Sequence, residues 1–188
     1  MNTELMFSSK TDNWSTPQDF YNKLNDEFQF TLDPCASHNN AKCKKYYTEK
    51  ANGLLQDWSN EVVFCNPPYG RQIKEWVKKC YDEALNGTRI VLLIPARTDT
   101  SYFHDYIYNK HLAEIRFIKG RLKFGDSKNS APFPSMLVIY NWLKYIITKG
   151  EWMKMSLEIY NVKCEITIPE NLQDKKTRNK YTRYTREY

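Results

Sequence analysis

The amino-acid sequence lacks several features that mark particular protein classes. None of its apolar runs approaches the ~18 residues that a membrane-spanning helix requires. Its first ten residues, MNTELMFSSK, lack the positively charged start and the apolar stretch of a secretory signal. Its five cysteines are an odd number without a repeating spacing, which argues against a disulfide framework. These absences predict a cytoplasmic protein with reduced thiols and no membrane partner.

The composition is that of a folded globular chain. Of its 188 residues, 41% are hydrophobic and 15% are aromatic, which is enough for one core. The net charge is +6, but residues 172–188 carry six basic and two acidic side chains and so contribute +4 of it. We therefore expect one domain at residues 1–145, an extension at 146–171 that could add strands, and a basic, flexible tail at 172–188. Such a tail supports nucleic-acid binding only weakly, because it is as often a solvated segment.

The first part of the chain predicts a helix followed by a strand. Thr16-Pro17-Gln18-Asp19 has a hydroxyl residue for the N-cap, a proline in the first turn and an acid three residues after the cap. Phe28, Phe30 and Leu32 then alternate with polar residues, which predicts a strand that ends at Asp33-Pro34. The polar residues 37–52 predict a loop or a short irregular helix.

The middle of the chain alternates between strands and helices. Apolar runs predict strands at 61–65, 89–95, 114–118 and 136–142, and helical spacing predicts a helix from Ile73 to a stop at Asn86-Gly87 and another near 102–111. This order is typical of an α/β fold, with a largely parallel sheet and flanking helices.

Polar groups follow three of these strands, where open α/β sheets bind their ligands. They are Asp33-Pro34, Asn66-Pro67-Pro68-Tyr69 and Arg97-Thr98-Asp99. The amine of a nucleobase such as adenine is a poor nucleophile, because its lone pair is delocalised into the ring. The side-chain carbonyl of Asn66 and the backbone carbonyl of Pro67 could accept its two N–H bonds and return the lone pair to nitrogen.

The other two residues of this motif fit the same chemistry. Pro67 and Pro68 have a fixed φ that makes the loop rigid, and the ring of Tyr69 could stack on a base taken out of a duplex. The alternative is a simple turn that ends a strand, since asparagine and proline form turns readily. The position between a short apolar strand and an amphipathic helix favours the catalytic interpretation.

Taken in order, a set of short segments resembles the phage-associated DNA N6-adenine methyltransferases. The segments are Trp14-Ser15-Thr16-Pro17, Thr31 to Ser37, Asn52-Gly53-Leu54, Asp57-Trp58, Asn66 to Tyr69, Pro95 to Thr100, Gly120 to Phe124 and Ala131 to Ser135. The resemblance implies a Rossmann-like methyltransferase fold over residues 1–145, S-adenosylmethionine as the donor, and a flipped adenine of duplex DNA as the acceptor. It also implies a bacterial or phage-infected cell as the setting.

The same resemblance implies residues for the two substrates. Those for the cofactor are Thr16, Pro17, Asp33, Pro34, Cys35, Ala36, Asn52 and Leu54, and those for DNA are Arg97, Arg121 and Lys123. Asp33 is the candidate for the ammonium group of the donor, although it could simply cap the following turn. Trp14 and Trp58 are expected in the core or the wall of the cofactor site. Two departures stand out: no G-x-G follows Asp33, and Asn52 stands where an acid is expected.

Other interpretations stay open from the sequence alone. Cys35, His38 and Cys43 invite a zinc interpretation, but a fourth ligand is missing, so we expect no metal. The Asn-Pro-Pro-Tyr motif could instead present cytosine N4 or a glutamine amide of a protein. A noncatalytic nucleic-acid-binding protein on the same fold is a further alternative. The oligomeric state and the DNA target are left open.

Overall fold

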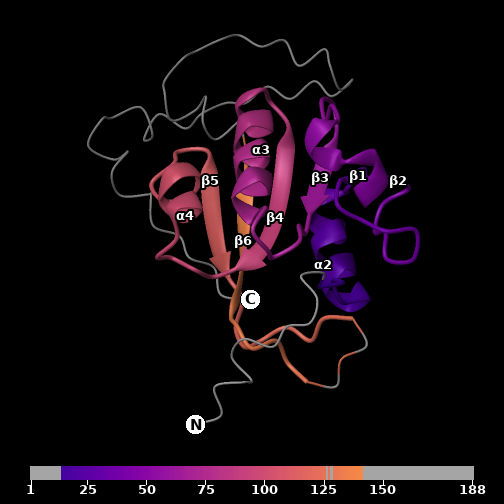
Figure 1. The fold of residues 1–188 in the computed structure, drawn as a ribbon, viewed down its shortest axis with the longest axis vertical. Coiled ribbons are helices and arrows are strands. Elements are labelled where there is room, and N and C mark those ends of the chain that lie inside the picture. Colours follow the sequence, from indigo (N-terminus) through magenta and orange to yellow (C-terminus); the bar gives the residue numbers. More distant parts are fainter. Residues whose placement is uncertain (1–13, 126, 128, 142–188) are drawn as a thin grey trace, which may run out of the picture.

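The computed structural model describes residues 14–125, 127 and 129–141. These residues form a six-stranded sheet in the order β2-β1-β3-β4-β6-β5 (Figure 1). The strands are β1 Leu32–Asp33, β2 Lys45–Tyr46, β3 Val62–Cys65, β4 Arg89–Pro95, β5 Ala113–Phe117 and β6 Ser135–Tyr140. Neighbours from β2 to β4 are parallel, whereas β6 is antiparallel to both β4 and β5. Of the strands described, β6 alone therefore runs in the opposite direction.

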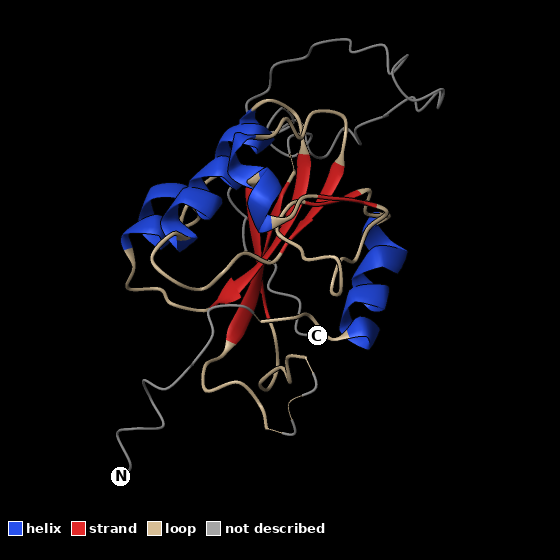
Figure 2. Ribbon diagram, turned by 45° about the vertical axis from the view of Figure 1, so that its right-hand side comes forward, coloured by secondary structure: helices blue, strands red, loops and turns tan. Residues whose placement is uncertain are grey.

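Helices cover both faces of this sheet. The α-helices are α2 Gln18–Phe28, α3 Ile73–Leu85 and α4 Ser101–Tyr106, and two short 3₁₀-helices span Glu49–Ala51 and Gly53–Leu55. Figure 2 shows the sheet between α2 on one side and the other α-helices on the opposite side. The predicted α/β fold with a largely parallel sheet and flanking helices is confirmed.

Alternating side chains of β4 build the two halves of the core. Ile90, Leu92 and Ile94 pack in the cluster that contains the buried faces of α3 and α4. Val91 and Leu93 pack in the cluster that contains α2. Successive strand side chains point to opposite faces, so a strand covered on both sides must be apolar throughout. The continuous run of β4 is explained by this position.

The N-terminal elements differ from the sequence prediction in three respects. Thr16 does not cap a helix, because α2 begins at Gln18 after Pro17 and has no side-chain cap hydrogen bond. The predicted strand shrinks to β1, since α2 continues through Phe28 and Gln29 follows in the left-handed conformation with φ 56°. Residues 37–52 contain β2, which the polar composition did not predict, because an edge strand needs no apolar face.

The remaining expectations have mixed outcomes. The predicted helix near 102–111 ends earlier, at Tyr106. Within the part of the chain that the structure describes, the helices are too short or too polar to cross a bilayer. The predicted extension at 146–171 and the tail at 172–188 lie outside the described residues.

Candidate active site

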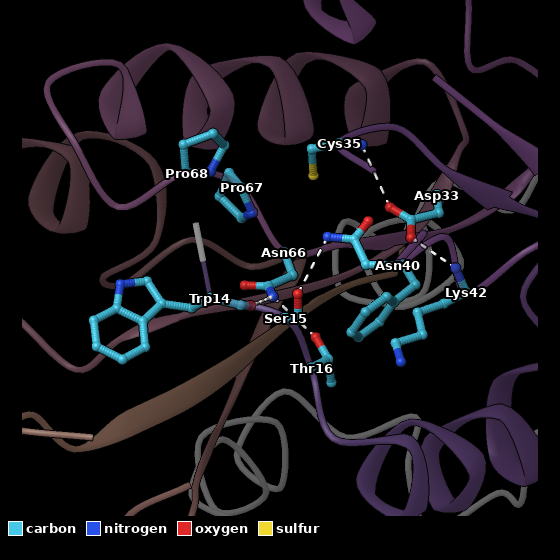
Figure 3. A pocket seen from close by; sticks show the side chains of 11 residues that line it. Trp14, Ser15, Thr16, Asp33, Cys35, Asn40, Lys42, Asn66, Pro67 and Pro68 are labelled. Carbon is cyan, nitrogen blue, oxygen red and sulfur yellow. Dashed lines mark hydrogen bonds between the residues drawn. The ribbon is translucent and has the colours of Figure 1, made fainter. Parts of the chain in front are cut away.

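The carboxyl ends of β1 and β3 open onto a cleft (Figure 3). The two strands are parallel neighbours, so Asp33 at the end of β1 and Asn66 just after β3 lie at the same edge of the sheet. The segment that leads into α2 closes a further side. The lining residues are Trp14, Ser15, Thr16, Asp33, Cys35, Asn40, Lys42, Phe64, Asn66, Pro67 and Pro68.

The Asn66–Tyr69 loop is anchored by buried neighbours. Phe64 and Cys65 precede it and are almost completely buried in β3, and Pro67 is buried as well. Asn66 itself is half-buried at the cleft. Two consecutive prolines lack N–H donors and end the strand pairing, so the chain leaves the sheet at this point. The loop therefore presents Asn66 from a rigid base.

The side-chain amide of Asn66 is held at both ends. Its nitrogen donates to the backbone carbonyl oxygen of Trp14 at 2.5 Å and to the hydroxyl oxygen of Thr16 at 2.9 Å. Its oxygen accepts a hydrogen bond from the Tyr69 hydroxyl at 2.8 Å. A carbonyl oxygen has two lone pairs, so Oδ1 of Asn66 can accept one more hydrogen bond.

The hydroxyl of Tyr69, the last residue of this loop, points toward β4. The hydroxyl is also 3.3 Å from the backbone oxygen of Leu93 in β4. The ring meets Phe124 and Phe133 edge-on, with centroid distances of 6.1 and 5.6 Å. Burial raises the pKa of Tyr69 well above its usual value, so the hydroxyl stays protonated. Stacking of a base on this ring stays a prediction, and the contact with Asn66 is a role that the sequence did not reveal.

Asp33 places a buried carboxylate on the other side of the cleft. It is 5% exposed, and it accepts hydrogen bonds from the backbone N–H groups of Lys42 at 3.1 Å and Cys35 at 3.4 Å. Burial raises the pKa of Asp33 to about 6, although these two N–H groups and the Lys42 cation act in the opposite direction. Asp33 thus caps the turn that follows it and is still charged at neutral pH.

The structure brings together only some of the residues predicted for the cofactor and catalysis. The predicted residues that line the cleft are Thr16, Asp33, Cys35, Asn66, Pro67 and Pro68. Of the two tryptophans expected in the core or the cofactor wall, Trp14 lines the cleft and Trp58 is buried in the core. The predicted residues outside the lining of the cleft are Pro17, Pro34, Ala36, Asn52, Leu54, Tyr69, Arg97, Arg121 and Lys123. The side chains of Arg97, Arg121 and Lys123 are exposed, and Arg97 follows the end of β4. None of these placements tests a role in binding.

The side chain of Asn52 stabilises the turn in which it lies. It has a φ of 51°, in the left-handed region that asparagine tolerates, and its side-chain oxygen accepts from the backbone N–H of Leu54 at 3.3 Å. The next residue, Gly53, lies so close to Pro34 that a β-carbon would sit 2.0 Å from the Pro34 oxygen. This contact fastens the turn to the segment that carries Asp33 and Cys35.

Sequence reasoning missed four residues that line the cleft: Ser15, Asn40, Lys42 and Phe64. Asn40 accepts from the backbone N–H of Ser37 at 2.6 Å and donates to the Ser15 hydroxyl at 3.2 Å. It thereby ties the loop after β1 to the segment before α2. For Asn40 and Lys42 the only sequence signal was the polar composition of residues 37–52, which a solvated loop explains equally well. Ser15 lies in a segment that carries the family resemblance and Phe64 in a predicted strand, but neither was predicted to line the site.

The cysteines and the histidine considered for zinc have separate partners. Cys35 Sγ lies 3.6 Å from Cys65 Sγ, His38 contacts the Tyr46 hydroxyl, and Cys43 contacts the Tyr21 hydroxyl. Among the described residues, the structure brings no three histidine, cysteine or acidic side chains together as metal ligands.

The sheet with its reversed strand β6, the flanking helices and the Asn-Pro-Pro-Tyr loop at the carboxyl edge define the class as Rossmann-like methyltransferases. The chain matches the model of the DNA N-6-adenine-methyltransferase (Dam) family over residues 4–162, and it belongs to that family. Membership in a methyltransferase family implies a methyl donor.

The names of two relatives describe methyltransferases. A DNA N-6-adenine-methyltransferase of Escherichia phage T1 is 34% identical over 113 residues, which are 59% of this chain and 46% of the relative. YfdM of Escherichia coli (strain K12), whose name also contains the word methyltransferase, is 40% identical over 65 residues, which are 31% of this chain and 71% of the relative. The match to this chain thus spans about half the length of the phage relative.

Proposed function

We propose that this protein transfers a methyl group from S-adenosylmethionine to the N6 amine of an adenine that is flipped out of duplex DNA. The observation that carries the proposal is the amide of Asn66, which is fixed at the edge of a cleft with one lone pair of Oδ1 still able to accept. The family match and the name of the phage relative support adenine as the acceptor. The proposed catalytic unit is residues 1–145.

In this proposal Asn66 and Pro67 act on the amine. Oδ1 of Asn66 and the backbone oxygen of Pro67 accept its two N–H bonds, which draws the nitrogen lone pair out of the ring and toward the methyl donor. Transfer breaks the carbon–sulfur bond of the donor and leaves S-adenosylhomocysteine. The methylated amine, which is then positively charged and acidic, loses a proton to water, so a strong general base is unnecessary. The face of the Tyr69 ring is proposed to stack on the flipped base and so replace the stacking lost on flipping.

A buried carboxylate in the lining of the cleft suits the methyl donor. When bound, S-adenosylmethionine supplies an electrophilic sulfonium methyl group. Its ammonium group suits Asp33, because a carboxylate whose pKa is raised by burial gains from an adjacent cation. Cys35 lies beside Asp33 in the same lining and would flank the donor. Arg97, Arg121 and Lys123 are exposed cations and are proposed to contact DNA phosphates.

Incubation of the full chain with methyl-tritiated S-adenosylmethionine and unmethylated DNA tests the proposal. The expected result is label in N6-methyladenine after digestion to nucleosides. Label in 4-methylcytosine would assign cytosine as the acceptor, and label in added protein would assign a glutamine amide. DNA binding without label in any product would favour the noncatalytic alternative and overturn the proposal.

Donor binding is expected to weaken in mild acid. In the protein without donor the pKa of Asp33 is about 6, so the carboxylate is charged above this pH. The ammonium group of the donor would lower this pKa in the complex. Affinity should therefore be flat near neutral pH and fall about tenfold between about pH 7 and about pH 5. Isothermal titration calorimetry with S-adenosylhomocysteine, which retains the ammonium group, measures this profile.

The matched variant for this profile is Asp33→Asn. It removes the titrating group, so its weaker affinity should not change over the same pH range. An equally steep fall in Asp33→Asn would assign the pH dependence to another group and contradict the prediction.

A further inference from the structure

The segment before α2 forms direct hydrogen bonds with the Asn66–Tyr69 loop. Trp14 and Thr16 both accept hydrogen bonds from the side chain of Asn66, which lies 50 positions after Thr16 in the sequence (Figure 3). Thr16 is 4% exposed, so its hydroxyl is almost completely removed from water. A buried hydroxyl must find its hydrogen-bond partners within the protein, and here one of them is Asn66.

The Thr16 hydroxyl hydrogen-bonds to Asn66 and does not cap the helix that follows it. A threonine before a proline-started helix usually caps the first turn with its side chain, but α2 has no side-chain cap hydrogen bond. The local sequence therefore favours one partner for Thr16, and the tertiary structure supplies a different one. Such a departure from local preference is expected where function decides the geometry.

We propose that Thr16 is a positioning residue that holds the amide of Asn66 in the orientation needed to accept the substrate amine. The inference rests on the proposed function and adds a residue to it. An amide nitrogen carries two protons, and Trp14 and Thr16 together accept both of them. A rotation of the amide by half a turn would bring Oδ1 against the Trp14 carbonyl oxygen, where two acceptors repel each other.

The far end of the amide is restrained as well. The Tyr69 hydroxyl donates to Oδ1 and so favours the same orientation. Loss of Thr16 leaves the Trp14 oxygen and the Tyr69 hydroxyl in place, so the amide keeps its average orientation but gains freedom to rotate. The expected consequence is a moderate loss of catalytic rate, since an acceptor must be aligned when the transition state forms.

This role differs measurably from the direct contact with the donor that the sequence resemblance implies for Thr16. A residue that binds the donor changes the affinity for it. A residue that orients Asn66 changes kcat and leaves the donor affinity unaltered. The two assignments thus separate in one kinetic experiment.

The experiment compares Thr16→Val with Thr16→Ser in the full chain. Valine has the shape of threonine without the hydroxyl, and serine restores the acceptor. We expect Thr16→Val to lower kcat for DNA methylation about three- to tenfold, which corresponds to one hydrogen bond. Its KM for S-adenosylmethionine and its Kd for S-adenosylhomocysteine should equal those of the wild type, and Thr16→Ser should restore most of kcat.

Thr88→Val is the matched control. Thr88 is also 4% exposed, and its hydroxyl lies 3.5 Å from the backbone oxygen of Trp58. It directly precedes β4, however, and so lies at the amino ends of the strands, away from the cleft at their carboxyl ends. It should change stability without changing kcat. Should Thr16→Val fail to fold, Thr16→Ala carries the same comparison with Thr16→Ser.

Each outcome assigns a cause. An active wild type with an unchanged kcat in Thr16→Val overturns the positioning role, and so does a kcat loss that Thr16→Ser fails to restore. A raised KM for the donor at constant kcat assigns Thr16 to the cofactor instead. A wild type that methylates nothing overturns the proposed function itself, independently of the Thr16 comparison.

Discussion

Replacement of Asn66 by alanine is expected to lower the rate constant of the methyl-transfer step by about 10²- to 10³-fold, the range seen when one preorganised hydrogen-bonding group leaves an active site. The variant removes the side-chain oxygen that we propose accepts the substrate amine. It also removes the donor to Trp14 and Thr16, so the segment before α2 loses one of its attachments. Methyl transfer to DNA under single-turnover conditions measures the loss without a contribution from product release.

Two comparisons make this result specific. Asn22→Ala removes the same side chain from an exposed position of α2 and should leave the rate constant of methyl transfer unchanged. The Kd of Asn66→Ala for S-adenosylhomocysteine should stay within a few-fold of the wild type, because Asp33 is untouched. An Asn66→Ala variant with the wild-type rate would show that the loop is only a turn, and the catalytic assignment would be lost.

Replacement of Gly53 by alanine is expected to destabilise the protein by about 3 kcal/mol, at the upper end of the usual range for overpacking. The added β-carbon would lie 2.0 Å from the backbone oxygen of Pro34 and 3.1 Å from the ring of Trp76. The first of these is backbone next to Asp33, so it can give way only by moving one wall of the cleft. Urea denaturation measures the free energy of unfolding. Gly53→Ala should also bind S-adenosylhomocysteine more weakly than the wild type does.

Leu55→Ala is the matched control for Gly53→Ala. Leu55 belongs to the same 3₁₀-helix but is 80% exposed, so its truncation should change the free energy of unfolding by less than about 0.5 kcal/mol. Equal stability of Gly53→Ala and the wild type would mean that the turn does not press on Pro34, and the link between this turn and the cleft would be wrong.

The elements that the sequence predicted well are those with a strong local signal. α3 follows from apolar residues at helical spacing and a stop at Asn86-Gly87, where Gly87 has a φ of 100°. β4 follows from a continuous apolar run, which needs cover on both faces. The edge strand β2 has neither signal, because it is short and polar and is defined by its pairing with β1.

The site shows the same division. Asn66, Pro67, Pro68 and Asp33 were predicted to lie at the carboxyl edge, because residues that directly follow parallel strands must meet there. Asn40 and Lys42 line the same cleft without any pattern that predicted them. A loop side chain reaches a site through the path of the backbone, which local spacing does not encode.

The sequence by itself determined the α/β order, the two-sided core and the motif that belongs at the strand ends. Only the tertiary structure decided that the Thr16 hydroxyl meets Asn66 rather than its own helix, and that the Asp33 carboxyl is buried enough to raise its pKa to about 6. The physical reason is the distance along the chain over which each effect acts. Periodicity and capping preferences act over a few neighbouring residues, whereas the partner of a hydroxyl and the solvation of a carboxylate depend on segments that meet only when the chain has folded.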